Sequence, residues 1–144
     1  MDINMNKIIR IGNVSSTNPT DMTVRVAFSD EDNLVSDDLK VLNHGSKSSK
    51  EFYMPAVNEQ VVCIFLPNGR NTGFVIGSFF SQEDNPPGGA SQDKRILEHN
   101  GDLEIKCSGQ VNITGSTGDV IVNGISLVNH IHPESIGTVT GKPQ

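Results

Sequence analysis

The sequence is poor in aromatic residues, in basic residues and in long apolar runs. Its 144 residues include no tryptophan, one tyrosine and six phenylalanines, and 17 acidic against 11 basic residues give a net charge of −6. Binding to a phosphate backbone needs a basic surface, so this charge argues against a nucleic-acid partner. No run reaches the ~18 apolar residues of a membrane span, and residues 1–13 lack the apolar core of a signal peptide. We therefore expect a soluble chain that is made in the cytoplasm.

Apolar residues and cysteines are also scarce. Hydrophobic residues make up 35% of the chain, which is a lean supply for a globular core and favours stabilisation by oligomerisation. The two cysteines, Cys63 and Cys107, lie far apart in the sequence. Because Cys63 sits inside an apolar run, we expect a buried free thiol rather than a disulfide.

Short alternating or β-branched segments dominate the first eighty residues, and no window has the 3.6-residue period of an amphipathic helix. Strands are predicted at residues 7–14, 22–28, 39–42, 61–66 and 73–80. Residues 61–66 (VVCIFL) are apolar on both faces, which suits a central barrel strand, and Asn68-Gly69 marks a turn before the last strand. Five strands in this length predict a small closed Greek-key barrel of the OB type, with a small β-sandwich as the alternative.

The pattern changes after residue 80. Residues 81–93 (SQEDNPPGGASQD) contain two prolines and two glycines and predict a linker. Beyond the linker, three apolar-x-apolar triplets are separated by polar residues and glycine: LEI at 103–105, VNI at 111–113 and VIV at 120–122. Each triplet points two side chains to one face and is followed by a polar turn, which is typical of a prism with one strand per pass.

Three triplets in one chain bury too little surface to fold alone, because such units need several stacked neighbours. Winding three chains about one axis gives the apolar side chains a shared core and pairs the strand edges between chains. We therefore predict an intertwined trimeric β-helix, a triangular prism, after the linker. A lone hairpin tail is the alternative.

A His-x-His pair follows the last triplet. On an extended strand, residues two apart project to the same side, so His130 and His132 present two imidazoles together. One chain supplies two nitrogens, whereas three chains about an axis supply six, which complete an octahedral shell. Metal bonds suit a tapering tip that has no width for an apolar core. The alternative is a pair of surface histidines without a metal.

Residues 124–144 (GISLVNHIHPESIGTVTGKPQ) resemble the tip of phage baseplate assembly protein V, the central spike of Mu-like contractile tails, whose family ends in a His-x-His-Pro apex and a short Gly/Thr tail. Residues 53–62 (YMPAVNEQVV) and 74–87 (FVIGSFFSQEDNPP) are similar to the barrel pattern of the same family. The resemblance thus covers nearly the whole chain. Ile131 stands where the family commonly has Thr, and Lys142 interrupts what is often a Pro-Pro end.

The pattern and the resemblance together predict an OB-fold collar domain at residues 1–80, a linker at 81–93, a trimeric β-helix at 94–128 and a metal-binding apex at 129–144. The resemblance implies one iron ion per trimer, bound octahedrally by His130 and His132 of all three chains, with calcium or chloride as further apex ions. The implied partners are two more copies of the chain, the baseplate hub, the tail tube proteins and the target cell envelope. The implied location is the tail tip of a virion, a tailocin or another contractile injection system.

The expected role is membrane piercing on sheath contraction, and we do not expect an enzyme. The sequence has no phosphate-cradling glycine loop, no strained serine elbow and no cysteine near an activating histidine. We expect His44, His99 and the acidic residues of segment 30–38 to lie at a solvated surface. The alternative function is an OB-fold module that binds oligosaccharide or single-stranded nucleic acid.

Overall fold

The computed structural model describes residues 8–67, 72–115, 118–132, 137 and 141. Among these residues there is no α-helix, and the regular elements are β-strands and one 3₁₀ turn. The elements are β1 (Ile9–Asn18), β2 (Thr23–Phe28), η2 (Ser29–Glu31), β3 (Leu34–Val35), β4 (Leu39–Val41), β5 (Gln60–Phe65), β6 (Gly73–Ser78), β7 (Ile121–Val122) and β8 (Ile125–Ser126). The chain divides into two compact units, Met1–Glu98 and His99–Gln144, which are described separately.

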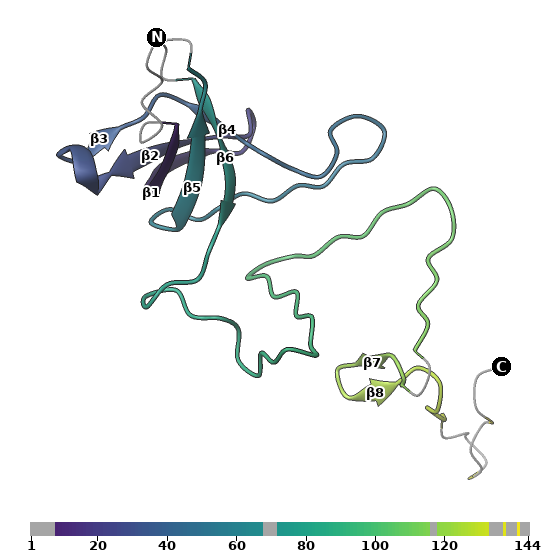
Figure 1. Cartoon of the computed structure of the whole chain (residues 1–144). Helices are drawn as coiled ribbons and strands as arrows, with labels where there is room; N and C mark the ends of the chain where they lie inside the picture. The colour runs from purple at the N-terminus through teal and green to yellow at the C-terminus, as the bar shows by residue number, and fades with distance from the viewer. Residues whose placement is uncertain (1–7, 68–71, 116–117, 133–136, 138–140, 142–144) are drawn as a thin grey trace. The chain divides into compact units, whose positions relative to one another are not determined.

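Five strands of the first unit close into a barrel (Figure 1). The order is β1-β5-β6-β4-β2, and β1 pairs with β2 as well as with β5, so the ring has no open side. All of these pairs are antiparallel except β4–β6, in which Lys40 pairs with Phe74 and Val41 with Val75. The short strand β3 extends the sheet beyond β2. A five-stranded closed barrel with this order is OB-like. This confirms the predicted all-β barrel and excludes the alternative of a small β-sandwich.

The observed strands start and end close to the predicted positions, with one clear extension. Strand β1 continues to Asn18, beyond the predicted end at residue 14, because the chain resumes pairing with β2 after a register shift between Val14 and Ser16. Such a bulge lets a strand bend and still keep its partner. The predicted turn at residues 68–69 lies outside the described residues.

The core fills the barrel interior. Its fully buried apolar side chains come from every strand of the ring: Val14, Val24, Val26, Phe28, Leu39, Val61, Cys63 and Val75. Thr23, which alternates along β2 with the core residues, is buried as well, because both β1 and β4 pair with this end of the strand. The expectation of a buried free thiol at Cys63 is confirmed, and Cys107 is a free thiol at the surface.

The second unit contains one β-hairpin, in which Ile121 pairs with Ser126 and Val122 with Ile125. Asn123 (φ 49°) and Gly124 (φ 81°) form its two-residue turn. Positive φ at both turn residues is the type I′ conformation, which Asn-Gly favours. Residues 99–115 contain no strand in this single chain. The prism is not formed by one chain, and the trimeric β-helix stays a prediction.

Candidate metal centre and barrel pocket

A network around Asp119 holds the chain between the hairpin and the histidines. The hydroxyl of Ser126 and the backbone N–H of Val128 (3.2 Å) both donate to the Asp119 carboxylate. The N–H of Asn129 in turn donates to the Ser126 hydroxyl oxygen at 2.7 Å. These hydrogen bonds, chiefly that from Ser126, lower the pKa of Asp119 because they stabilise the charged carboxylate. An ionised Asp119 therefore fixes the residues that lead into His130.

The structure brings the rings of His130 and His132 together. Their centroids are 5.0 Å apart and the ring planes cross at 87°. Two imidazoles on adjacent positions of one ion, with metal–nitrogen bonds of about 2.1 Å, have centroids roughly 4.5 Å apart. The observed spacing therefore fits two ligands of one ion.

The tautomer of His130 is set by the backbone. Its Nδ1 atom lies 2.9 Å from the carbonyl oxygen of Ser126. A carbonyl oxygen only accepts, so Nδ1 carries the proton and the free lone pair is on Nε2. Metal-binding histidines commonly have this arrangement, in which the second ring nitrogen donates to a carbonyl and thereby orients the ring. His130 is half-buried and His132 is exposed.

The other two histidines lie apart from this pair. His44 is exposed, with Nδ1 2.6 Å from a carboxylate oxygen of Glu51, and His99 is also exposed. Within the described ranges, no group of three or more His, Cys, Asp or Glu side chains gathers in a way that could hold a metal ion. One chain thus brings two neighbouring imidazoles, fewer than the three or four protein ligands of an ordinary zinc site.

The acidic segment after β2 is solvated, as expected, and two of its carboxylates form ion pairs. Asp30 accepts a hydrogen bond from Arg10 (3.1 Å), whose guanidinium carbon also lies 3.7 Å from the centroid of the Phe28 ring. Asp38 accepts one from Arg25 (2.9 Å). The segment is therefore tied to the barrel rather than arranged as a calcium loop.

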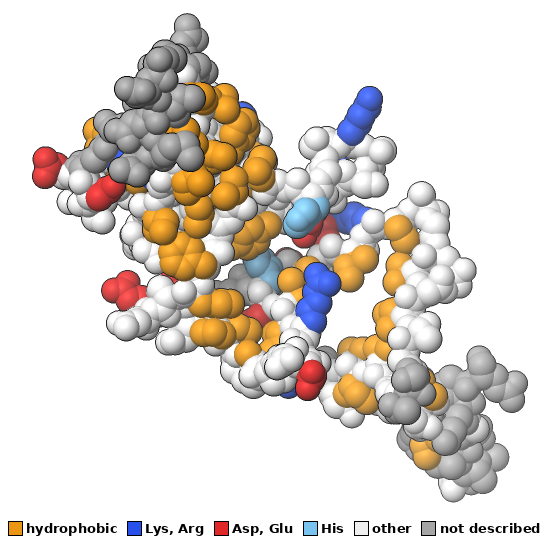
Figure 2. Space-filling view, in the orientation of Figure 1, with side chains coloured by type: hydrophobic (Ala, Val, Ile, Leu, Met, Phe, Trp, Pro, Cys, Tyr) orange, Lys and Arg blue, Asp and Glu red, His pale blue; other side chains and the backbone are white. Residues whose placement is uncertain are grey.

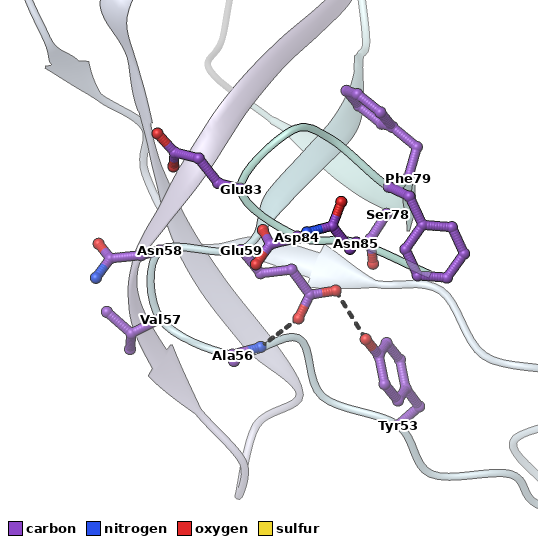
Figure 3. Close-up of a pocket in the computed structure, with 11 residues that line it drawn as sticks. Tyr53, Ala56, Val57, Asn58, Glu59, Ser78, Phe79, Glu83, Asp84 and Asn85 are labelled. Carbon is purple, nitrogen blue, oxygen red and sulfur yellow. Dashed lines mark hydrogen bonds between the residues drawn. The ribbon is translucent and has the colours of Figure 1, made fainter. Parts of the chain in front are cut away.

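The barrel unit also has a pocket that the sequence analysis missed (Figure 3). Its volume is about 750 Å³ and its walls come from residues 53–59 and 78–85. Three aromatic and three acidic residues line it, with no basic residue beside them: Tyr53, Phe79 and Phe80, and Glu59, Glu83 and Asp84. Eighteen residues separate the two segments in the sequence, so no local motif predicts the pocket.

Glu59 fixes one wall of the pocket. Its carboxylate accepts hydrogen bonds from the Tyr53 hydroxyl (2.8 Å) and from the N–H of Ala56 (2.7 Å), as Figure 3 shows. Burial is the main cause of the raised pKa of Tyr53. In contrast, Glu83 and Asp84 are exposed on the loop after β6. The pocket thus combines a fixed carboxylate with two that are open to a ligand.

In the part of the chain that the structure describes, no helix has the length and apolar character needed to cross a bilayer.

Comparison with known proteins adds no family to these observations. The sequence matches no protein-family model, and no curated protein matches it.

Proposed function

We propose that the protein is the central spike at the tip of a contractile, phage-like tail, and that three copies form one rigid piercing needle. The observation that carries this proposal is the exposed apolar surface of the second unit. Ten large apolar side chains of this unit are between 46% and 77% exposed: Leu103, Ile105, Val111, Ile113, Ile121, Val122, Ile125, Leu127, Val128 and Ile131. Figure 2 shows such side chains in orange along the segment.

Exposed apolar residues at alternate positions of an extended chain favour assembly with other copies. Burying one Leu, Ile or Val side chain stabilises a structure by about 1.5–3 kcal/mol. Three chains wound about one axis bury the triplets against each other. They also supply backbone partners to residues 99–115, which form no strand alone. The resemblance of residues 124–144 to the spike tip supports the same arrangement.

The OB-like barrel suits the role of a collar that seats the trimer on the baseplate hub at the end of the tail tube. Its closed ring and continuous core give the needle a rigid base. On sheath contraction, the load passes from this collar into the intertwined shaft and then into the target envelope. The proposed role is mechanical, and no step in it breaks a covalent bond of the target.

At the apex, His130 and His132 of three chains would together hold one iron ion, as the resemblance implies. The bound ion supplies bonds between chains at a tip too narrow for an apolar core. The protonated Nδ1 of His130 supports this assignment, because it leaves Nε2 as the ligand atom. Calcium and chloride remain further candidates for the apex, without assigned residues.

Sedimentation and metal analysis of the purified full chain test the proposal. We expect a trimer that does not dissociate on dilution and that contains close to one ion per three chains. Sedimentation as a monomer at all concentrations contradicts the proposal. A trimer without metal contradicts the assignment of His130 and His132 as metal ligands, but it is still consistent with the proposed trimeric shaft.

The barrel pocket favours a second candidate function, a binding module for oligosaccharide. Aromatic faces such as Tyr53 and Phe79 stack on sugar rings, and carboxylates accept hydrogen bonds from sugar hydroxyls. The absence of basic residues among its lining makes single-stranded nucleic acid a poorer occupant. Binding of envelope oligosaccharides that is lost in Tyr53→Ala would support this candidate. Tight binding of an oligonucleotide at low salt would instead support the nucleic-acid version.

A further inference from the structure

We infer that the loop between β4 and β5 is an arm that docks into the barrel pocket of a second copy of the chain, so that the collars link into a ring. The inference rests on the proposed trimer and adds the contact between its barrels. We define the arm as residues 43–53 and the pocket as above. Three features carry the inference: the defined shape of the arm, the opposite charges of arm and pocket, and the position of the pocket at the base of its own arm.

The arm has a fixed conformation. At its base, the side-chain oxygen of Asn43 accepts a hydrogen bond from the N–H of Tyr53 (3.1 Å). Near its tip, Ser46 and Lys50 form an antiparallel bridge. Gly45, directly before this bridge, has a φ of +98°, and a Cβ there would meet a backbone oxygen at 2.5 Å, so this position requires glycine. Figure 1 shows the arm extending away from the barrel as a narrow loop.

The tip of the arm is basic, and an apolar residue is exposed near its base. Lys47 and Lys50 are exposed, and neither forms an ion pair with any residue that the structure describes. Residues 42–50 contain no acidic residue, in a chain whose net charge is −6. Phe52 is 66% exposed on the same arm. The arm thus offers two ammonium groups and an aromatic ring.

The pocket has the complementary character. Its exposed carboxylates, Glu83 and Asp84, also form no ion pair with any described residue. Phe79 and Phe80 beside them are 40% and 63% exposed. An ammonium group gains from nearby carboxylates and from the face of an aromatic ring. Lysines with an exposed Phe are therefore the kind of ligand that this pocket fits.

The pocket of a neighbouring copy suits the tip better than the pocket of the same chain. Tyr53 closes the base of the arm and also lines the pocket, so each chain has its own pocket at the base. The tip lies five residues further along, at up to about 17 Å for an extended strand. A threefold ring is built from heterologous contacts, in which one patch of each subunit meets a different patch of the next. A projecting arm and a concave pocket are two such patches.

Limited trypsin digestion of the full chain tests the contact, because trypsin cleaves after Lys47 and Lys50. We compare the wild type with E83Q/D84N, which neutralises the pocket and leaves both cleavage sites unchanged. Two ion pairs at about 0.5–1 kcal/mol each correspond to about a tenfold change in arm release. We therefore expect cleavage at the arm to become about tenfold faster in E83Q/D84N. The matched control, D93N/E98Q, removes the same charge outside the pocket and should leave the rate unchanged.

Cross-linking identifies the chain that supplies the arm. Chains labelled with ¹⁵N are refolded with unlabelled chains, and a zero-length carbodiimide joins lysines to carboxylates in contact. We expect mixed-label cross-links from Lys47 or Lys50 to Glu83 or Asp84. Equal cleavage rates in all three proteins, or cross-links within one chain only, overturn the arm contact in a protein that still sediments as a trimer. Sedimentation as a monomer overturns both the contact and the spike, so the two failures are distinct.

Discussion

The Nδ1–H of His130 donates to the carbonyl oxygen of Ser126 at 2.9 Å, and this bond connects the hairpin β7–β8 to the proposed metal ligand. Ser126 also pairs with Ile121 across the hairpin and donates its hydroxyl to Asp119. The direction of the His130 ring therefore depends on the hairpin being formed. Mutations in the turn are expected to reach the metal without touching a ligand.

The first prediction concerns the ligands. Replacing His130 or His132 with Ala removes half of the proposed nitrogens, so metal content should fall from about one ion per trimer to below about one-tenth. Elemental analysis after gel filtration measures it. The variants His44→Ala and His99→Ala remove histidines from exposed positions and should keep the metal. Full metal content in both the His130→Ala and the His132→Ala variant would contradict the proposed metal site.

The second prediction concerns the turn. Gly124 has a φ of 81°, and a β-branched residue there costs of order 1–3 kcal/mol. We expect Gly124→Val to weaken metal binding by about tenfold, the lower end of what lost orienting contacts cost a metal site. Competition with a chelator measures the affinity. Gly118→Val is the control, because Gly118 has open space around its Cβ position and no positive φ. An unchanged affinity in Gly124→Val would show that the hairpin does not orient His130.

The third prediction concerns the barrel wall. A Cβ on Gly12 would lie 2.6 Å from both the Ala27 carbonyl oxygen and a methyl group of Val26. Gly12→Ala should therefore lower the free energy of unfolding of the barrel by about 1–3 kcal/mol. Tyr53 is the single tyrosine in a chain without tryptophan, so its fluorescence during denaturation reports on the barrel. Gly88→Ala, where nothing lies within 4 Å, should have the midpoint of the wild type.

The fourth prediction concerns the buried thiol. Burial raises the pKa of Cys63 to about 11. At pH 8, iodoacetamide should thus modify only Cys107 in the folded chain, and both thiols after denaturation. Mass spectrometry counts the adducts, and Cys107→Ser should leave the folded chain unreactive. Rapid alkylation of Cys63 in the native state would contradict its place in the core.

The same shift sets a pH dependence. The thiolate forms more readily in the unfolded chain, so the stabilising effect of the protonated thiol is complete below about pH 9 and is lost as pH rises towards about 11. The denaturation midpoint of the wild type should therefore fall between about pH 8 and about pH 10.5. Cys63→Ala removes the titrating group, so its midpoint should change less over this range, although its starting stability is lower.

Much of the barrel could be predicted because its core follows local alternation. Val24, Val26 and Phe28 repeat every second residue and all point into the core, as strand geometry requires. The extension of β1 to Asn18 was less visible, since polar residues there pair through their backbones. The short strand β3 likewise has no apolar period to announce it.

The site was predictable only where its residues are neighbours in sequence. His130 and His132 were proposed as ligands from their spacing together with the resemblance of residues 124–144, and the metal itself stays a prediction. The roles of Asp119 and Ser126 depend on the Asn123-Gly124 turn, a strong hairpin signal that the triplet interpretation passed over. Tyr53 and Phe79 line the same pocket because β5 and β6 are paired. Strands that are separated in the sequence can pair without any local sequence pattern that indicates it.

The parallel contact between β4 and β6 has a consequence for synthesis. Strand β6 pairs with both β4 and β5, so the ring cannot close until Ser78 has emerged from the ribosome. Domains generally fold in order as they emerge, and the triplets at 103–122 are translated after the last barrel strand. Each nascent chain can therefore complete its barrel before the apolar triplets emerge. These triplets are then exposed for less time to neighbouring chains that are still unfolded.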